Sequence, residues 1–186
     1  MLSPSFSPFP ELVTDRLLLR KMTMDDAGSV FELRSNPQVM KYISRPLAKT
    51  IEDAQAWVQL IIDALEKNEG ITWCICLKEQ PDAHVGTIGF WRMQKENYRA
   101  EIGYMLHPSL HGRGIAYEAI QPVLEYGFEV MQLHSVEANA DPENIASIRL
   151  LEKAGFVREG LFKENYFFNG AFLDTVVYSK LRGLGL

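Results

Sequence analysis

The sequence is poor in cysteine, and its two cysteines do not suit a disulfide. Cys74 and Cys76 lie two positions apart in a strand-like run, so their side chains share one face of that strand. A metal site would need further ligands close by, and the nearest histidine in the sequence is His84. We therefore interpret both cysteines as small buried apolar residues and expect no bound metal.

Positive charge and long apolar runs are scarce as well. Lys and Arg number 19 against 24 Asp and Glu, for a formal net charge of -5, whereas sequence-independent binding of nucleic acid needs a basic face. No apolar run approaches the length of a membrane span, and residues 1–11 lack the pattern of a secretion signal. We expect a cytoplasmic protein with no nucleic-acid or membrane partner and with a loose leader over residues 1–11.

The chain also lacks internal repeats, low-complexity segments and any interdomain linker. Its 186 residues suffice for one domain with a substantial core, and a balance of 47% apolar and 23% charged residues is ordinary for a globular domain. The motif Gly-x-x-x-x-Gly-Lys-Ser/Thr is absent, which excludes a P-loop nucleotide-binding protein. We predict a single domain over residues 1–186.

Hydrophobic periodicity predicts two helices and a series of strands in the first half of the chain. Thr23 precedes a helix that ends before Asn36, and Thr50 with Asp53 begins a second helix that ends before Gly70. After Gly70 the apolar period changes to two, which is typical of strands. The predicted strands cover residues 12–21, 72–78, 85–93 and 98–106, and the last three form an antiparallel meander with turns at 81–83 and 94–97.

In the second half of the chain, a helix follows a glycine-containing turn and should kink at Pro122, which cannot donate a backbone hydrogen bond. A strand over 133–140 comes next. Together with the strand over 98–106, on the other side of the helix that contains Pro122, it would form a parallel pair with a crossover. Asn169-Gly170 is the strongest short signal for a β-hairpin. A helix near 141–155 and hairpin strands at 162–168 and 171–180 complete the prediction.

Residues 107–120 contain a strand end, a glycine turn and a helix start. Gly112 and Gly114 leave the backbone unshielded and free to adopt positive φ, so several N–H groups can point outward at the start of the helix. Backbone donors and the helix dipole together favour a phosphate group there. A plain structural turn is the alternative, since glycines are common in such turns.

His111-x-x-Gly114-x-Ala116 resembles the acyl-CoA pyrophosphate loop of the GNAT acetyltransferases, although His111 stands where that family usually has Gln or Arg. From Thr14 onward, five further motifs look like the branch of ribosomal-protein N-terminal acetyltransferases (RimJ/RimL-like). Each motif is weak alone, but five in the family's order are specific. They are Arg16-Leu17-x-Leu19-Arg20, Ala100-Glu101-Ile102-Gly103-Tyr104, Asn144-x-x-Ser147, Glu152-Lys153-x-Gly155-Phe156 and Asn169-Gly170-x-x-x-Asp174.

The resemblance implies an α+β fold: one GNAT-like domain with a mostly antiparallel twisted sheet of about seven strands, splayed at its centre, and four main helices. It also implies an N-acetyltransferase that uses acetyl-CoA as co-substrate and acetylates a primary amine by direct attack. A protein N-terminal α-amine is the acceptor in that branch, and a polyamine, an amino acid or an antibiotic is the alternative. A non-catalytic acyl-CoA sensor also stays open, as does the oligomeric state, a homodimer included.

The same resemblance implies roles for individual residues. The backbones of Met105 and Leu106 would bind the pantetheine arm, Asn144 would reach the same arm, and Ser147 would donate to the departing sulfur. Without the resemblance, Asn144 is an ordinary helix N-cap and Ser147 a helix-surface residue. Glu101 is the candidate general base, directly or through water, and an exposed strand carboxylate is the alternative reading. The pyrophosphate would lie on His111, Gly112, Arg113, Gly114, Ile115 and Ala116, with Arg113 as a cationic partner.

The acceptor side is the least diagnostic part of the sequence, and its predicted lining is Tyr42, Arg45, Tyr166 and Phe168. The need for a strong base depends on the acceptor, because an α-amine with a pKa near ~8 is partly neutral at pH 7 and a lysine near ~10.4 is not. No Cys–His pair suggests a covalent route. We interpret His107, His111 and His134 as structural.

Overall fold

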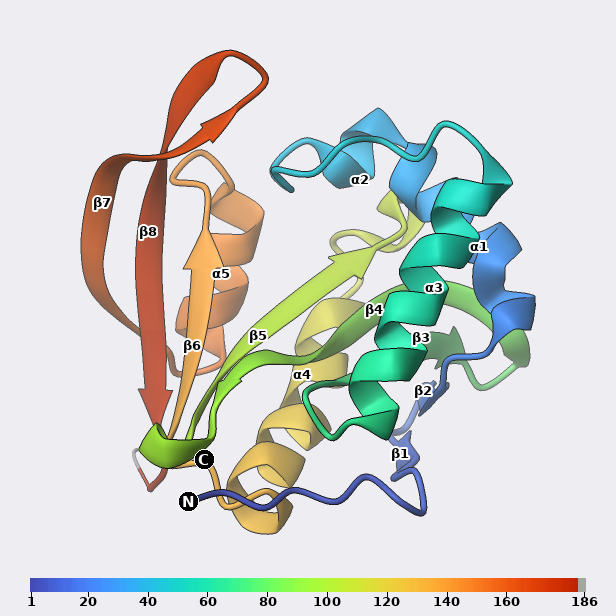
Figure 1. The fold of residues 1–186 in the computed structure, drawn as a ribbon, viewed down its shortest axis with the longest axis horizontal. Helices are drawn as coiled ribbons and strands as arrows, with labels where there is room; N and C mark the ends of the chain where they lie inside the picture. The colour runs from blue at the N-terminus through green and yellow to red at the C-terminus, as the bar shows by residue number, and fades with distance from the viewer. Residues whose placement is uncertain (184–186) are drawn as a thin grey trace.

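The computed structural model describes residues 1–183, and at its centre these residues form one mixed β-sheet of eight strands (Figure 1). The predicted domain therefore includes three residues, 184–186, that lie outside the described ones. The strands are β1 (Leu12–Val13), β2 (Leu17–Lys21), β3 (Ile71–Leu77), β4 (Gln80–Gln94), β5 (Arg99–Leu106), β6 (Ser135–Ala140), β7 (Val157–Phe168) and β8 (Ala171–Leu181), in the spatial order β1-β2-β3-β4-β5-β6-β8-β7.

The sheet is open along half of β5. β3, β4 and β5 form the predicted antiparallel meander, and β5 and β6 form the predicted parallel pair. That parallel pairing extends only from Arg99↔Ser135 to Glu101↔Glu137, after which the two strands diverge (Figure 1). β6 stays with β8 on its other edge up to Ala140↔Val176. The second half of β5 thus has one edge without a strand partner among the described residues, which confirms the expected splay.

Helices cover both faces of the sheet: α1 and α3 lie on one face, and α4 and α5 lie on the other (Figure 1). The predicted caps are confirmed, since the Thr23 and Thr50 N–H groups donate to Asp26 and Asp53 at 2.8 and 3.2 Å. None of the helices in residues 1–183 has the length and apolar character needed to cross a membrane. The helices are α1 (Ala27–Ser35), the short α2 (Pro37–Met40), α3 (Ile51–Glu66), α4 (Ile115–Glu125) and α5 (Ile145–Lys153).

Several strand boundaries differ from the prediction, among them the start of β7, which lies at Val157 and not at 162. The predicted first strand is two strands, because Thr14 turns the chain by bonding Leu17 twice: its N–H donates to Leu17 O at 3.0 Å and its Oγ1 accepts from Leu17 N–H at 3.0 Å. This turn accounts for eight strands in place of about seven. β4 begins at Gln80, so the turn before it lies at residues 78–79 and Pro81 lies in the exposed first part of the strand.

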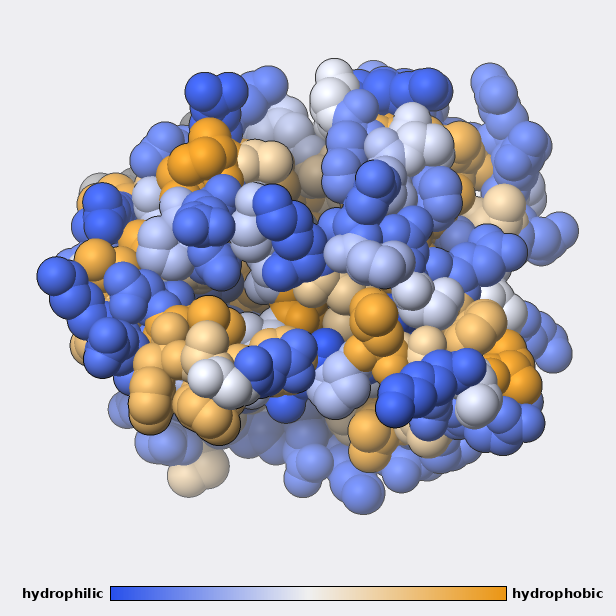
Figure 2. Space-filling model, turned by 90° about the horizontal axis from the view of Figure 1, so that it is seen from above, coloured by the Kyte–Doolittle hydropathy of each residue, from blue (hydrophilic) through white to orange (hydrophobic). Residues whose placement is uncertain are grey.

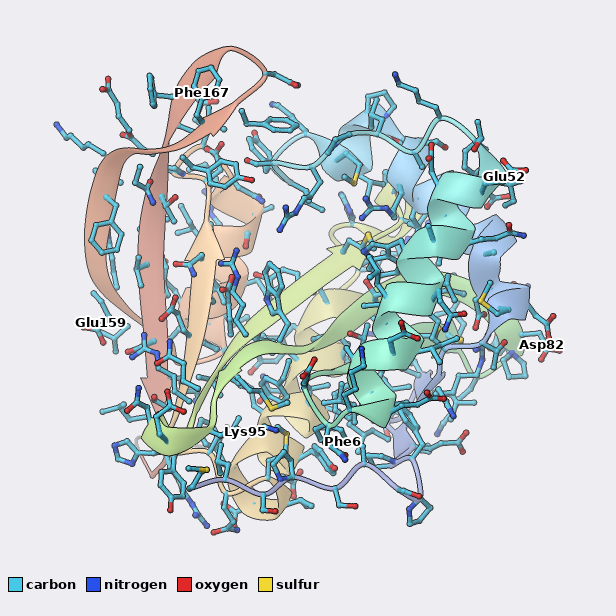
Figure 3. The ribbon with its side chains drawn as sticks, viewed as in Figure 1. Phe6, Glu52, Asp82, Lys95, Glu159 and Phe167 are labelled. Atoms are coloured by element: carbon cyan, nitrogen blue, oxygen red, sulfur yellow. The ribbon has the colours of Figure 1, made fainter. Side chains whose placement is uncertain are left out.

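The N-terminal segment is packed, contrary to the expectation of a loose leader. Leu2 and Phe6 are 5% and 4% exposed and belong to the main core. The indole N–H of Trp73 donates to the carbonyl of Pro10 at 2.6 Å, and the ring of Phe9 meets Trp73 edge-on. Figure 3 shows Phe6 at the end of the molecule where this segment passes α4. Buried apolar side chains hold the segment, which its prolines did not indicate.

α4 continues through Pro122, where we expected a kink. The carbonyl of Pro122 still accepts the N–H of Tyr126, and the chain then widens into a π-helical turn, Tyr126–Val130, closed by a bond from Met131 N–H to Tyr126 O at 3.0 Å. Gly127 in this turn lies against the sheet, since a Cβ there would be 2.7 Å from Phe90 Cζ. Four residues after the missing proline donor, the α-helix thus gives way to a π-helical turn.

The β7–β8 hairpin forms as predicted, with Asn169 and Gly170 both at positive φ (48° and 81°) and Phe168 paired with Ala171. Near its tip, Phe167 and Phe172 contact across the strands with ring centroids 5.0 Å apart (Figure 3). On the face seen in Figure 2, hydrophobic residues form small groups separated by hydrophilic ones. That face offers no single broad apolar surface of the kind an interaction module would use.

Candidate functional site

A cavity of about 570 Å³ lies where β5 and β6 separate. Its wall comes from both sides of the splayed sheet: α1 and the segment after α2 on one side, and β6, the start of α5 and the hairpin on the other. Tyr166 of the hairpin links the two sides, because its hydroxyl donates to the carbonyl of Ser44 at 3.3 Å. The volume is in the range that small-molecule sites occupy.

Glu101 lines this cavity from β5 and is only 8% exposed. Arg92 Nη1 donates to Glu101 Oε2 at 3.1 Å. Burial raises the pKa of the Glu101 carboxyl, and Arg92 and Asn139 only partly oppose that effect. The alternative of an exposed strand carboxylate is therefore wrong, and Glu101 is a buried carboxylate with increased basicity.

Ser147 also lines the cavity, and its hydroxyl has a partner that the sequence analysis did not identify. Tyr104 Oη and Ser147 Oγ are 2.6 Å apart, across from β5 to α5. Burial raises the pKa of Tyr104 to about 12, so the phenol stays protonated at neutral pH. Whichever hydroxyl donates within the pair, the other keeps a proton that it can give to a third group.

Asn144 is the N-cap of α5, where its side-chain oxygen accepts the N–H of Ser147 at 3.1 Å. This cap fixes the first turn of the helix and with it the position of Ser147. Asn144 also lines the cavity, and no hydrogen bond within residues 1–183 uses its side-chain NH₂. The ordinary capping role and a ligand-binding role are thus compatible, since they use different atoms of one amide.

The two residues predicted to bind through their backbones differ in orientation. The N–H of His107 donates to Val85 O on β4, and Met105 is paired with Thr87 on the same strand. Successive residues of a strand turn their backbone N–H and C=O groups to opposite edges. The backbone groups of Met105 therefore face β4, and those of Leu106 and Tyr104 face the open edge. The expectation for Met105 is therefore wrong for its backbone, although its side chain lines the cavity.

The glycine loop lies beyond the end of β5, on the surface and outside the wall of the cavity. Gly112 and Gly114 have φ of 73° and 76°, as predicted, and Gly114 is the N-cap of α4. No turn or loop hydrogen bond of residues 1–183 uses the N–H of Gly112, Arg113 or Gly114. His111 Nε2 lies 3.0 Å from Leu106 O, so this side chain ties the loop to the open edge of β5.

The predicted acceptor lining is found with one exception. Tyr42, Arg45 and Tyr166 line the cavity, whereas Phe168, at the end of β7, does not. The residue that was missed, Tyr104, had a usable signal. It lies two positions after the core residue Ile102 on β5, so it faces the side of the sheet that the later helices cover.

One buried group of residues has the composition of a metal site. Ligand atoms of Asp26, Cys74 and His84 lie within 4.8 Å of one another behind α1. Arg20, however, donates to both Asp26 carboxylate oxygens at 2.9 and 2.7 Å, and burial raises the pKa of the Cys74 thiol, which keeps it protonated. A guanidinium on the carboxylate and a neutral thiol do not fit a cation, and we assign no metal to this group.

Comparison with known proteins agrees with the motifs. Residues 16–157 match the family model described as an acetyltransferase (GNAT) domain. An uncharacterized N-acetyltransferase, p20 of Bacillus licheniformis, is 37% identical over 171 residues, which cover 92% of this chain and 96% of that protein. The spermidine N(1)-acetyltransferase of Vibrio cholerae is 27% identical over 167 residues, which cover 88% and 91%.

Solved structures agree on the fold. The crystal structure of a GNAT-family acetyltransferase from Bacillus anthracis has a TM-score of 0.82 and 34% identity, and the match covers 92% of this chain and 98% of that one. Ribosomal-protein acetyltransferases, RimJ and RimL among them, share the fold at less than 25% identity. The match spans nearly the whole of both chains, as the resemblance in the sequence implied.

Proposed function

The chain belongs to the GNAT family of N-acetyltransferases, and we propose that it takes the acetyl group from acetyl-CoA and transfers it to a protein N-terminal α-amine. The observation that carries the proposal is the open edge of β5. Glu101 reaches this opening from the face that α1 and α3 cover, and Tyr104 with Ser147 reaches it from the opposite face. A thioester held between them has a proton acceptor on one side and a proton donor on the other.

The chain has suitable groups for each part of acetyl-CoA. The backbone of Leu106 and Tyr104 can extend the sheet onto the pantetheine amides, and an N–H there can polarise the thioester carbonyl. The unbonded N–H groups at residues 112–114, with those that follow at Ile115 and Ala116, suit the pyrophosphate. Arg113 adds a cation, and the Asn144 NH₂ adds a donor at the pantetheine arm. Because the net charge is -5, these local donors are needed to hold a polyanion.

The transfer needs one proton acceptor and one proton donor. The amine nitrogen forms a bond to the carbonyl carbon, the C–S bond breaks, and the nitrogen loses a proton to Glu101, directly or through water. The sulfur gains a proton from the Tyr104–Ser147 pair. The raised pKa of Glu101 makes it the better base, while a thiol with a pKa near ~8.5 is a leaving group that needs only modest assistance.

The two candidate classes of acceptor each have specific support, and the non-catalytic sensor has less. An N-terminal α-amine has a pKa near ~8 and is partly neutral at pH 7, which suits a single buried carboxylate as base. A small amine fits the cavity of about 570 Å³ equally well by volume. A non-catalytic sensor would bind acetyl-CoA without turnover, and the buried, paired acid and base argue against it.

Calorimetric titration of acetyl-CoA into the wild type and Gly114→Glu tests the proposal. Wild type should bind, and the variant should not, because the new carboxylate lies where the pyrophosphate would. Gly28→Glu is the matched control: a Cβ there meets nothing within 4 Å, and the site lies on α1, away from the loop. Arg113→Glu makes the loop more negative by two charges at a residue that does not have positive φ, and it should also weaken binding. No binding to wild type would refute both the enzyme and the sensor.

A second variant separates the enzyme from the sensor. Ser147→Ala should lower kcat on the order of 10²-fold with acetyl-CoA affinity largely kept, because it removes one hydroxyl of the donor pair. Turnover is followed by release of the free thiol with an N-terminal peptide as acceptor. Binding of acetyl-CoA by the wild type without any turnover, over a panel of amines, would favour the sensor.

A further inference from the structure

Two arginines in the wall of the cavity lack carboxylate partners. Arg34 on α1 and Arg45 in the segment between α2 and α3 both line it, and neither forms an ion pair within residues 1–183. Arg92, also in the wall, differs because its guanidinium is paired with Glu101 at 3.1 Å. The two unpaired cations lie on the same side of the opening, since both come from the α1–α3 side of the sheet (Figure 1).

Arg34 is held in an orientation that costs free energy. Its guanidinium lies over the ring of Trp57, with Cζ 5.2 Å from the ring centroid, and its buried Nε has no hydrogen-bond partner. Burial and the like charge of Arg45 lower its pKa, and the carboxylate of Asp53, which forms no ion pair with Arg34, opposes them only in part. Stacking on an aromatic ring fixes the plane of a guanidinium and leaves its in-plane donors available. A partly buried cation with unused donors beside a second cation indicates that an anion belongs there.

Arg45 is exposed, yet it is positioned by its surroundings. Its N–H donates to Ile43 O at 2.6 Å, which makes a tight turn, and the neighbouring Ser44 carbonyl accepts from Tyr166 across the cavity. The hairpin thus holds the segment that carries Arg45 over the opening.

The opposite side of the cavity is acidic. Asp141 after β6 and Asp174 on β8 both line the wall, and each accepts one backbone N–H, from Glu143 and Glu164, at 2.8 Å. Neither forms an ion pair within the described residues. The cavity is therefore bipolar, with two unpaired cations facing a group of carboxylates.

We propose that Arg34 and Arg45 bind a carboxylate of the acceptor, so that the acceptor carries its amine and an anionic group in one short segment. The inference rests on the proposed function and narrows its acceptor. A zwitterionic acceptor satisfies both sides of the cavity, with its ammonium toward the acidic side before it loses its proton. The carboxylate comes either from a free amino acid or from an acidic side chain close behind a peptide's N-terminus. A polyamine would bring further positive charge to the arginines.

Matched acceptors test this. Leucine and leucinamide differ in the carboxylate and in the basicity of the amine beside it, so their rates are compared per neutral amine. The peptides Ser-Asp-Ala-Ala-amide and Ser-Asn-Ala-Ala-amide differ only in an acidic side chain. In one of the pairs, the member with the carboxylate should have at least tenfold higher kcat/KM than its neutral counterpart. The pair that shows this difference identifies the source of the carboxylate. Spermidine should be the poorest acceptor. Equal rates within both pairs, or a preference for spermidine, would overturn the inference.

The arginines are then changed one at a time. Arg45→Gln and Arg34→Gln should each raise KM for the charged acceptor at least tenfold more than for its neutral counterpart. Arg34→Lys should restore only part of the preference, because an ammonium lacks the planar fork. Arg158→Gln, an exposed arginine outside the wall, removes the same charge and should keep the preference. Since Arg45 lies on the surface, its variant remains informative if Arg34→Gln folds poorly.

This design separates the two proposals. If leucinamide and the neutral peptide are acetylated but charge makes no difference, the transferase stands and the carboxylate site fails. If acetyl-CoA does not bind and no acceptor is turned over, the proposed function itself has failed.

Discussion

Two groups of charged residues lie on the α1–α3 side of this protein, one buried and one in the wall of the cavity, and they differ in how their charges are neutralised. Behind α1, Arg20 binds both oxygens of Asp26, and Asp26 also accepts the N–H of Thr23 at 2.8 Å. Cys74 and His84 beside them are 0% and 5% exposed, and apolar side chains of α1 and α3 cover the group. In the cavity, by contrast, Arg34 and Arg45 have no ion-pair partner among residues 1–183.

The difference separates a structural from a functional use of charge. A buried ion pair with every oxygen bonded links β2, the turn before α1 and β3, and it leaves nothing for a ligand. Unpaired donors beside a cavity lower stability, and at functional sites a bound ligand supplies the missing hydrogen bonds. Changes in the first group should therefore alter folding, and changes in the cavity should alter turnover.

The largest expected effect is on folding. Asp26→Asn leaves the partly buried Arg20 without its carboxylate, and breaking a buried pair from one side costs about 3–5 kcal/mol of unfolding free energy. Burial alone would raise the pKa of Asp26, but Arg20 and Thr23 outweigh it and lower the pKa. Denaturant titration measures the loss, and kcat/KM of the protein that remains folded should stay near wild type.

Asp53→Asn is the matched control for that variant. Asp53 fills the same capping position at the start of α3, but it is exposed and forms no ion pair with a guanidinium among residues 1–183. The loss of unfolding free energy in Asp53→Asn should be clearly smaller than that in Asp26→Asn. Equal losses would mean that capping, not the buried pair, accounts for the effect.

A smaller effect is expected from pH. Burial lowers the pKa of His84 from 6.5 to about 4, against the opposing attraction of Asp26. Because the folded-state pKa is below the unfolded one, the stabilisation is complete above about pH 6.5 and is lost as the pH falls toward 4, by about 3 kcal/mol at most. Denaturant titrations at pH 7 and pH 5 should show this decrease in unfolding free energy. In His84→Gln the unfolding free energy should fall less steeply between these two pH values. An unchanged slope would contradict the assignment to His84.

Local features were predictable from the sequence, and features that depend on distant partners were not. Thr23, Thr50 and Asn169-Gly170 act within a few residues, so their caps and turn follow from chemistry that the sequence displays directly. The order of motifs then identified the fold. The packing of the N-terminal segment depends on Trp73, some 63 residues away from Pro10, and no local pattern in a proline-containing leader reports such a contact.

The candidate site divides in the same way. Glu101, Ser147 and Asn144 were found because the motifs contain them, and the structure brings all three to one cavity. The partner of Ser147 is 43 residues away on β5, and the sequence indicates only the face on which it lies. Arg34 is harder still to identify from the sequence. It stands out because it forms no ion pair, and this is known only once the neighbouring carboxylates have been located.

The smallest expected effect is also the sharpest test of the cavity as a functional region. Tyr104→Phe removes the hydroxyl that lies 2.6 Å from Ser147 Oγ and keeps the ring, so folding should be nearly unchanged. If the phenol orients Ser147 toward the departing sulfur, kcat should fall about tenfold with little change in KM, because a thiol leaving group needs only partial protonation. In the Ser147→Ala background the same change should cost much less, since the pair acts as one unit. Equal losses in both backgrounds would mean that the Tyr104 phenol acts independently of Ser147, and the two hydroxyls would then not be one donor pair.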